Sequence, residues 1–202
     1  MKKYELRELV DGAVMTALAA VLCYIRIIRL PWGGSVTLMS MLPIIVYSIK
    51  YGVKKGMLVS FAFSLIQLFQ GISDGLFSWG LSVPMLAACI LIDYIGAYSV
   101  IGIGGIFREK GIKGWICGAV CAGFARFVMH FISGVVIWKS FGELWSGFKT
   151  DNVLLYSFVY NGAYMLPEII FTVVGAAVLF GVPQTRRIIC GKTSFRPTAS
   201  DQ

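Results

Sequence analysis

Long apolar segments, separated by short groups of charged residues, run through the whole of this 202-residue chain. A helix that spans a membrane needs ~17–25 predominantly apolar residues, and most of these segments approach or exceed that length. The pattern predicts an all-α membrane protein, built as a bundle of six transmembrane helices. The six segments lie at roughly 9–28, 38–50, 56–73, 84–107, 115–138 and 155–181.

The composition excludes the soluble alternatives. Hydrophobic residues make up 57% of the chain and charged residues 14%, against ~45–50% and ~25% in ordinary soluble domains. A soluble domain of this size could not bury so much apolar surface, so we expect the excess to face lipid. Intrinsic disorder, a coiled coil and a secreted disulfide scaffold are excluded as well. The net charge of +8 comes from the loops, so no nucleic-acid partner is expected.

The distribution of lysine and arginine predicts the orientation in the membrane. Most of the 18 basic residues fall in loops on the side of the two termini, which favours a cytoplasmic location for both ends. The first segment follows acidic residues and lacks a clear cleavage site, so we interpret it as a membrane helix, not a cleaved signal. We divide the chain into a membrane domain, residues 1–182, and a polar, basic cytoplasmic tail, residues 183–202.

Ionisable side chains inside the apolar segments are the best indicators of a functional site. Each one costs ~2.5–3.5 kcal/mol near the centre of a membrane helix, so it needs a partner or a function. Asp93, Arg126, His130 and Glu168 lie in such segments, and Asn161 is their uncharged companion. The five cysteines include no C-x-x-C pair and the single histidine is not near them, so we expect no metal site.

Four residues of the fifth segment recur at a spacing of four: Arg126, His130, Gly134 and Trp138. On a helix such residues form one stripe that drifts by only ~40° per step. Gly134 leaves a gap beside the Trp138 ring, into which a flat ligand could slide. The alternative is that Gly134 admits a neighbouring helix, His130 bonds a carbonyl and Trp138 lies at the membrane interface.

The fourth segment contributes Asp93 and Tyr94. A buried aspartate could simply pair with Arg126, and that structural interpretation stays open. The neighbouring segments also supply aromatic rings, and a carboxylate among aromatic faces suits an organic cation better than an inorganic ion. The rings in question belong to His130, Trp138 and Tyr156.

In the sixth segment, Asn161, Tyr164 and Glu168 share one helix face because they lie at positions i, i+3 and i+7. The amide of Asn161 offers a donor and an acceptor, which suits the edge of a nitrogen heterocycle. The alternative is a helix kinked at Pro167 whose asparagine joins two helices.

Two further motifs bear on transport. The first loop, residues 30–37, is glycine-rich, carries Trp32, and is either a lid over an outward-facing pocket or a plain hairpin loop. Gly191-Lys192-Thr193 lacks the first glycine of a phosphate loop, since Arg186 stands in its place. The chain therefore has no motif for nucleotide hydrolysis, and uphill transport would need an ion gradient or a partner.

Together these residues resemble the thiamine-specific substrate-binding (S) component of energy-coupling factor vitamin transporters, from about Asp11 to about Val182. The most specific part is the Arg126 to Trp138 stripe joined to Tyr-x-x-x-x-Asn, residues 156–161. Ala13-x-x-x-Ala17 and the Gly-Gly loop agree but are less specific. The chain departs from the family at Asp93 and Arg126, where glutamate and lysine are common.

The resemblance implies a multi-pass protein of a prokaryotic cell membrane with a thiamine pocket near the outer face, no cofactor and no enzymatic activity. It implies that Trp138 and His130 contact the rings of the ligand, and that Ala13 and Ala17 pack on a transmembrane coupling subunit driven by two ATPase subunits. The ligand-binding residues that it implies are Trp32, Asp93, Tyr94, Arg126, His130, Gly134, Trp138, Tyr156 and Asn161.

Other functions remain as alternatives. One alternative is an S component for another flat heterocycle, such as a thiamine precursor or riboflavin. If that ligand were neutral, Arg126 alone would have to balance the charge of Asp93. A stand-alone membrane transporter is a further alternative. A non-catalytic scaffold would leave the polar stripe without a role. The sequence has no paired glutamates, metal-ligand cluster or nucleophile elbow, which argues against an intramembrane enzyme.

Overall fold

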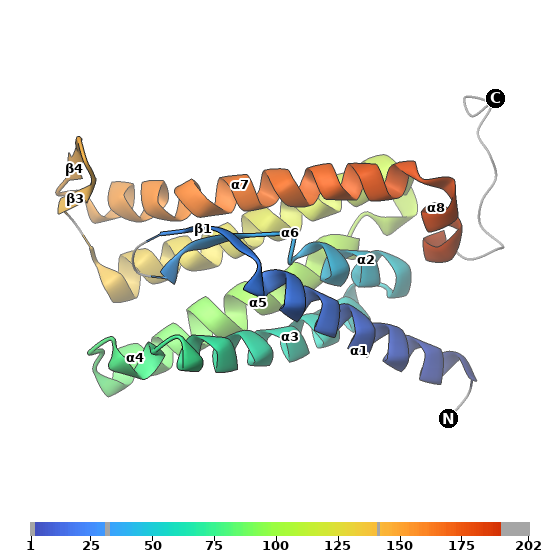
Figure 1. Ribbon diagram of the computed structural model, residues 1–202, viewed down its shortest axis with the longest axis horizontal. Coiled ribbons are helices and arrows are strands. Elements are labelled where there is room, and N and C mark those ends of the chain that lie inside the picture. The colour runs from blue at the N-terminus through green and yellow to red at the C-terminus, as the bar shows by residue number, and fades with distance from the viewer. Residues whose placement is uncertain (1–2, 31–32, 141, 191–202) are drawn as a thin grey trace.

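The computed structural model describes residues 3–30, 33–140 and 142–190 as a bundle of long helices with two short β-hairpins (Figure 1). Among these residues, four helices are long and apolar enough to cross a membrane, which agrees with the predicted helical membrane protein but is fewer than six. They are Val53–Ser73, Val83–Gly105, Arg108–Trp138 and Val153–Gly181. Many of their large apolar side chains are exposed on the outside of the bundle, as expected for contact with lipid.

The helices differ in regularity. The first ones are α1 (Lys3–Tyr24), α2 (Leu42–Tyr51) and α3 (Val53–Ser73), followed by the short turn η2 (Leu76–Ser78). The next membrane-length segment consists of α4 (Val83–Cys89), the π-helix η3 (Ile90–Gly96), α5 (Ala97–Ser99) and η4 (Val100–Gly105). After the turn η5 (Arg108–Lys110) come α6 (Gly111–Ser133), the π-helix η6 (Gly134–Trp138), α7 (Val153–Gly181) and α8 (Pro183–Cys190).

The predicted first segment, 9–28, is wrong at its end. Helix α1 ends at Tyr24, and the strand β1 (Arg26–Arg29) pairs antiparallel with β2 (Ser35–Thr37). The isoleucines of β1 extend the apolar run, but β-branched side chains fit a strand better than a helix. A second hairpin, β3 (Gly142–Trp145) with β4 (Phe148–Thr150), also lies outside the all-α prediction.

The predicted boundary between the second and third segments is also wrong. No loop separates α2 from α3, because Gly52 alone joins them with φ of 91°, a conformation that favours glycine. Lys54 and Lys55 lie in the first turn of α3, and Lys55 pairs with Glu8 of α1. Charged residues marked the edge of the apolar segment, but they did not mark the end of a helix.

Glycines allow three of the helical segments to approach closely. A Cβ atom at Gly118 of α6 would lie 2.1 Å from the carbonyl oxygen of Gly104 in η4. One at Gly102 would lie 2.5 Å from the backbone nitrogen of Met57 in α3. The main apolar core fills the space beside these contacts and includes Met41, Ile45, Phe63 and Ile101. Small residues thus fix the backbone spacing on which the neighbouring site depends.

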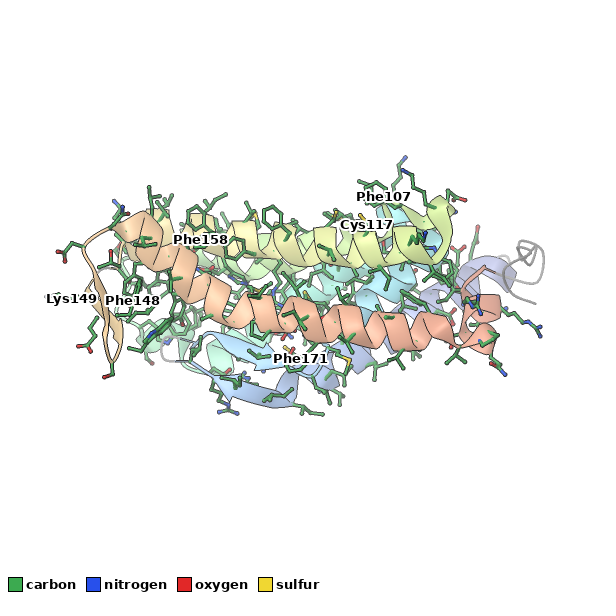
Figure 2. All side chains as sticks on the ribbon, turned by 90° about the horizontal axis from the view of Figure 1, so that it is seen from above. Phe107, Cys117, Phe148, Lys149, Phe158 and Phe171 are labelled. Carbon is green, nitrogen blue, oxygen red and sulfur yellow. The ribbon has the colours of Figure 1, made fainter. Side chains whose placement is uncertain are left out.

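The two ends of the bundle are built differently. The start of α1, helix α8 and the α2–α3 junction lie at one end, and α4 and the β3–β4 hairpin lie at the other (Figure 1). Figure 2 shows the same polarity, with Phe107 at one end and Phe148 and Lys149 at the other. The segment predicted as a polar tail, 183–202, begins as α8, in which Ile189 is 7% exposed and joins the main core.

Candidate substrate-binding site

A cavity of about 240 Å³ opens between η3, the α6–η6 helix, α7 and the hairpin residues Gly33 and Gly34. The structure brings eight of the nine predicted ligand-binding residues into its lining, and the ninth, Trp32, lies outside the described residues. The eight come from three separate segments of the chain. They are Asp93, Tyr94, Arg126, His130, Gly134, Trp138, Tyr156 and Asn161.

Two π-helices position half of these residues. Asp93 and Tyr94 lie in η3, and Gly134 and Trp138 begin and end η6. The backbone N–H of Lys139 donates to the carbonyl of Gly134 at 2.9 Å, the i→i+5 bond of a π turn. The wider turn keeps Trp138 over the cavity. In a regular α-helix, Trp138 would lie further around the helix axis from Arg126 and His130. Such π segments are rare and are frequently found at functional sites.

Asp93 is the centre of a hydrogen-bond cluster at one wall of the cavity. Its carboxylate accepts from His130 Nδ1 at 2.9 Å, from Trp138 Nε1 at 3.3 Å and from the hydroxyl of Ser133. An ionised carboxylate only accepts, so Nδ1 carries the hydrogen of the imidazole. Nε2 of His130 is buried and has no hydrogen-bond partner within the described part of the chain.

Arg126 does not pair with Asp93, which excludes the simple structural pairing considered from the sequence. Its side chain is 4% exposed and Nη2 donates to the hydroxyl of Tyr98 at 3.0 Å. The guanidinium carbon lies 4.3 Å from the Tyr98 ring centroid, a cation–π distance. Its ion pair is with Glu168 of α7, with Nη1 and Oε1 3.9 Å apart. Nε and Nη1 form no hydrogen bond with any described residue.

Aromatic rings form the remaining walls. The rings of Trp79 and Trp138 meet at 5.5 Å between centroids and 61° between planes, so one wall is an indole pair. Across the cavity, Tyr156 and Tyr160 stack along α7 with centroids 6.5 Å apart. His130 contacts the rings of both Tyr98 and Tyr164 edge to face. Flat surfaces on two sides of a small cavity suit a flat aromatic ligand.

Asn161 is more constrained than the sequence suggested. Its Nδ2 donates to the carbonyl of Ser157 at 2.9 Å and to the carbonyl of His130 at 3.3 Å. Its Oδ1 accepts from the hydroxyl of Tyr164 at 2.8 Å. The amide therefore joins α7 to α6, as one interpretation of the sequence held. It also borders the cavity, as the interpretation of Asn161 as a ligand contact requires.

A second chamber of about 620 Å³ adjoins the cavity and shares five lining residues with it: Gly33, Trp79, Tyr94, Tyr98 and Trp138. Arg26 of β1 and Asp74, which follows α3, form an ion pair at its edge. Partial burial opposes the charge of Arg26, but the hydrogen bond with Asp74 and the negative charge of Asp74 together outweigh this effect and raise the pKa of the guanidinium. The hairpin is thus tied to the α3 end beside the cavity.

The comparisons with known proteins decide the family. The model of the thiamine transporter protein family matches residues 9–187. The chain belongs to this family. It is similar to the thiamine transporter ThiT of Bacillus subtilis, with 32% identity over 190 residues, 87% of this chain and 91% of that protein. It is also similar to ThiT of Lacticaseibacillus paracasei, with 25% identity over 197 residues, 88% of this chain and 89% of that protein.

The fold has a solved counterpart in ThiT from Listeria monocytogenes. The two structures align with a TM-score of 0.72 over 91% of this chain and 99% of that one, at 22% sequence identity. Membership of the family confirms the resemblance found in the sequence to a thiamine-specific S component. The protein is a multi-pass cell-membrane transporter component and not an enzyme, and thiamine is its cargo, not a cofactor.

Several residues that line the cavity were not predicted from the sequence. Tyr98 lies five residues after Asp93, a spacing that joins one face only in a π-helix, and nothing in the sequence announced η3. Trp79 comes from the stretch 71–91, in which no ligand contact was assigned. A cluster of tyrosines along α7 was the available signal for Ser157, Tyr160 and Tyr164. Gly33 and Gly34 belong to the glycine-rich loop that the sequence offered as a lid, and Ser140 had no signal.

Gly134→Ala should weaken ligand binding and lower the melting temperature. The added Cβ would lie 2.2 Å from Ser157 Oγ and 3.1 Å from Asn161 Nδ2, so these side chains or the spacing between η6 and α7 would have to change. Overpacking of this kind costs ~1–3 kcal/mol. The matched control is Gly162→Ala on α7, where a Cβ meets nothing within 4 Å. Thermal unfolding and calorimetric titration on both variants would check this, and unchanged values for Gly134→Ala would contradict it.

Proposed function

We propose that this chain is the high-affinity thiamine-binding S subunit of an energy-coupling factor transporter, energised by separate coupling and ATPase subunits. The observation that carries the proposal is the Asp93 carboxylate, hydrogen-bonded to His130 and Trp138 at the wall of an aromatic cavity. Thiamine is a permanent thiazolium cation joined to an aminopyrimidine. It needs an anion, stacking surfaces and hydrogen-bonding groups, and the cavity offers each of these.

The ligand contacts follow from that chemistry. Trp138 and His130 present ring faces for stacking, and Asp93 supplies the charge that balances the thiazolium. His130 Nε2 and the Nε and Nη1 atoms of Arg126 are buried and form no hydrogen bond with a described residue, and these are the polar atoms that we expect to bind the nitrogen atoms or hydroxyl group of the ligand. Tyr94 and Tyr156 complete the polar lining, and Trp32, which precedes Gly33 in the sequence, is the ninth ligand contact that we propose. Nanomolar binding corresponds to ~−12 kcal/mol, which stacking, one balanced charge and several hydrogen bonds can supply.

The topology that we propose has six membrane spans with both termini in the cytoplasm. The four long apolar helices would be joined by α1 and by the short α2, which has 10 residues. The start of α1 and α8 lie at the same end of the bundle, as an even number of spans requires (Figure 1). The basic residues gather toward that end, consistent with a cytoplasmic location.

The purified chain should bind thiamine without any other subunit and without ATP. We expect thiamine to quench tryptophan fluorescence, because Trp79 and Trp138 line the cavity, and calorimetry to give about one site per chain. Riboflavin and the isolated aminopyrimidine precursor are the comparison ligands, expected to bind at least about tenfold more weakly. Absence of both quenching and heat would overturn the proposal. Tighter binding of riboflavin would assign the cavity to a different vitamin.

A further inference from the structure

We propose that Glu168 is a positioning residue that sets the charge preference of the cavity. In this arrangement it neutralises Arg126 from outside the cavity lining, so that Asp93 keeps its negative charge for a cationic ligand. The proposal rests on the function proposed above and deepens it, because it explains how a site that contains an arginine can select a cation.

Glu168 is almost completely buried, with 1% of its side chain exposed, in the middle of a membrane-length helix. Its Oε2 accepts from the backbone N–H of Thr37 at 2.6 Å, and its Oε1 accepts from the Thr37 hydroxyl at 2.6 Å and the Ser40 hydroxyl at 3.2 Å. A carboxylate that accepts three hydrogen bonds and donates none fits the ionised form. A buried charge in such a place needs a counter-charge, and Arg126 provides it at 3.9 Å.

The charges around the cavity then separate into two groups. Arg126 and Glu168 form one pair, and its net charge is zero. Asp93 and His130 form the other, in which the imidazole donates one hydrogen bond and the carboxylate retains its charge. The net charge of the described groups at the cavity is therefore −1, which matches a monovalent cation. Without Glu168, the guanidinium would cancel Asp93 and remove that preference.

Glu168 also fastens the first hairpin beside the cavity. Thr37 is the last residue of β2, and Gly34, the residue directly before β2, donates its N–H to the Tyr160 hydroxyl at 3.1 Å. Helix α7 thus holds β2 at two points, and Gly34 itself lines the cavity. Any test must separate this anchoring role from the effect of charge.

Glu168→Gln makes that separation. The amide oxygen can still accept from the Thr37 N–H, and the NH₂ group can donate to the hydroxyls of Thr37 or Ser40, which are acceptors as well as donors. The variant therefore keeps the size and hydrogen bonds of the anchor but loses the charge. Thr37→Val is the complementary variant, because it removes the hydroxyl that hydrogen-bonds Glu168 and Ser40 and leaves all charges in place.

The experiment compares thiamine with an isosteric analogue whose thiazolium is replaced by an uncharged aromatic ring, by calorimetry on the purified full chain. For Glu168→Gln we expect at least a tenfold rise in the Kd of thiamine and less than a threefold change for the neutral analogue, consistent with loss of a buried charge. For Thr37→Val we expect both ligands to weaken by the same factor. Equal weakening of both ligands in Glu168→Gln, or no change in either, would overturn the inference.

The double variant Arg126→Gln/Glu168→Gln tests the same idea if the single variant is poorly folded. It removes both charges of the pair and restores a net charge of −1. The Kd of the neutral analogue divided by the Kd of thiamine should therefore return to within about threefold of its wild-type value. The inference would be overturned if this ratio stayed at its value in Glu168→Gln, or if the two ligands bound equally well. If wild-type protein does not bind thiamine at all, the proposed function fails first; if it binds and the ratio does not respond, only the role of Glu168 fails.

Discussion

Asp93→Asn should weaken thiamine binding by at least about tenfold, or ~1.4 kcal/mol and more. The substitution keeps the shape of the side chain but removes the negative charge that balances the thiazolium. It also replaces one acceptor oxygen by an NH₂ group among donors from His130, Ser133 and Trp138. Calorimetric titration gives the affinity, and thermal unfolding of the same sample gives the stability.

The two measurements separate a binding role from a structural one. If Asp93 only held His130 and Trp138 in place, the variant would melt earlier and its folded fraction would bind thiamine normally. Asp151→Asn is the matched control, since it makes the same chemical change at an exposed position before α7. Normal affinity in Asp93→Asn, whatever its melting temperature, would remove this residue from the ligand contacts that we propose.

The long apolar helices could be predicted because hydrophobic length is a strong signal in a membrane. The helices from Val53 to Ser73 and from Val153 to Gly181 agree closely with the segments 56–73 and 155–181. Hydropathy does not distinguish a helix from a strand, which is why the end of the first segment, residues 25–28, was assigned to a helix. It also does not detect a break at one residue with positive φ such as Gly52.

The sequence predicted the residues of the candidate site that share one helix. It did not predict which side chains on different helices pair with each other. The four-residue spacing from Arg126 to Trp138 was visible in the sequence, and the structure places all four residues at one cavity. The sequence offered Asp93 as a partner for Arg126, whereas the structure pairs Arg126 with Glu168. Only the packing of α6 against α7 and η3 decides between them. The contribution of Tyr98 was hidden because it depends on the π-helical turn before it.

Substitution of both Ala13 and Ala17 by leucine or tryptophan should abolish thiamine uptake and leave thiamine binding intact. Both alanines are exposed on α1, four residues apart, and no residue of α1 lines the cavity. Small side chains at this spacing let a second helix approach closely, and bulky ones prevent it. Since the sequence has no phosphate loop, loss of the coupling subunit would remove the source of energy for transport.

Co-purification with the coupling and ATPase subunits, uptake in cells and titration of the isolated variant measure the three consequences separately. Leu18→Trp is the matched control, because Leu18 is 45% exposed on the same helix but lies on a neighbouring stripe, so the complex and uptake should persist. Retained uptake in the variant that replaces Ala13 and Ala17 would contradict the proposal that these residues contact the coupling subunit. Loss of thiamine binding would instead show that Ala13 and Ala17 support the fold of the S subunit.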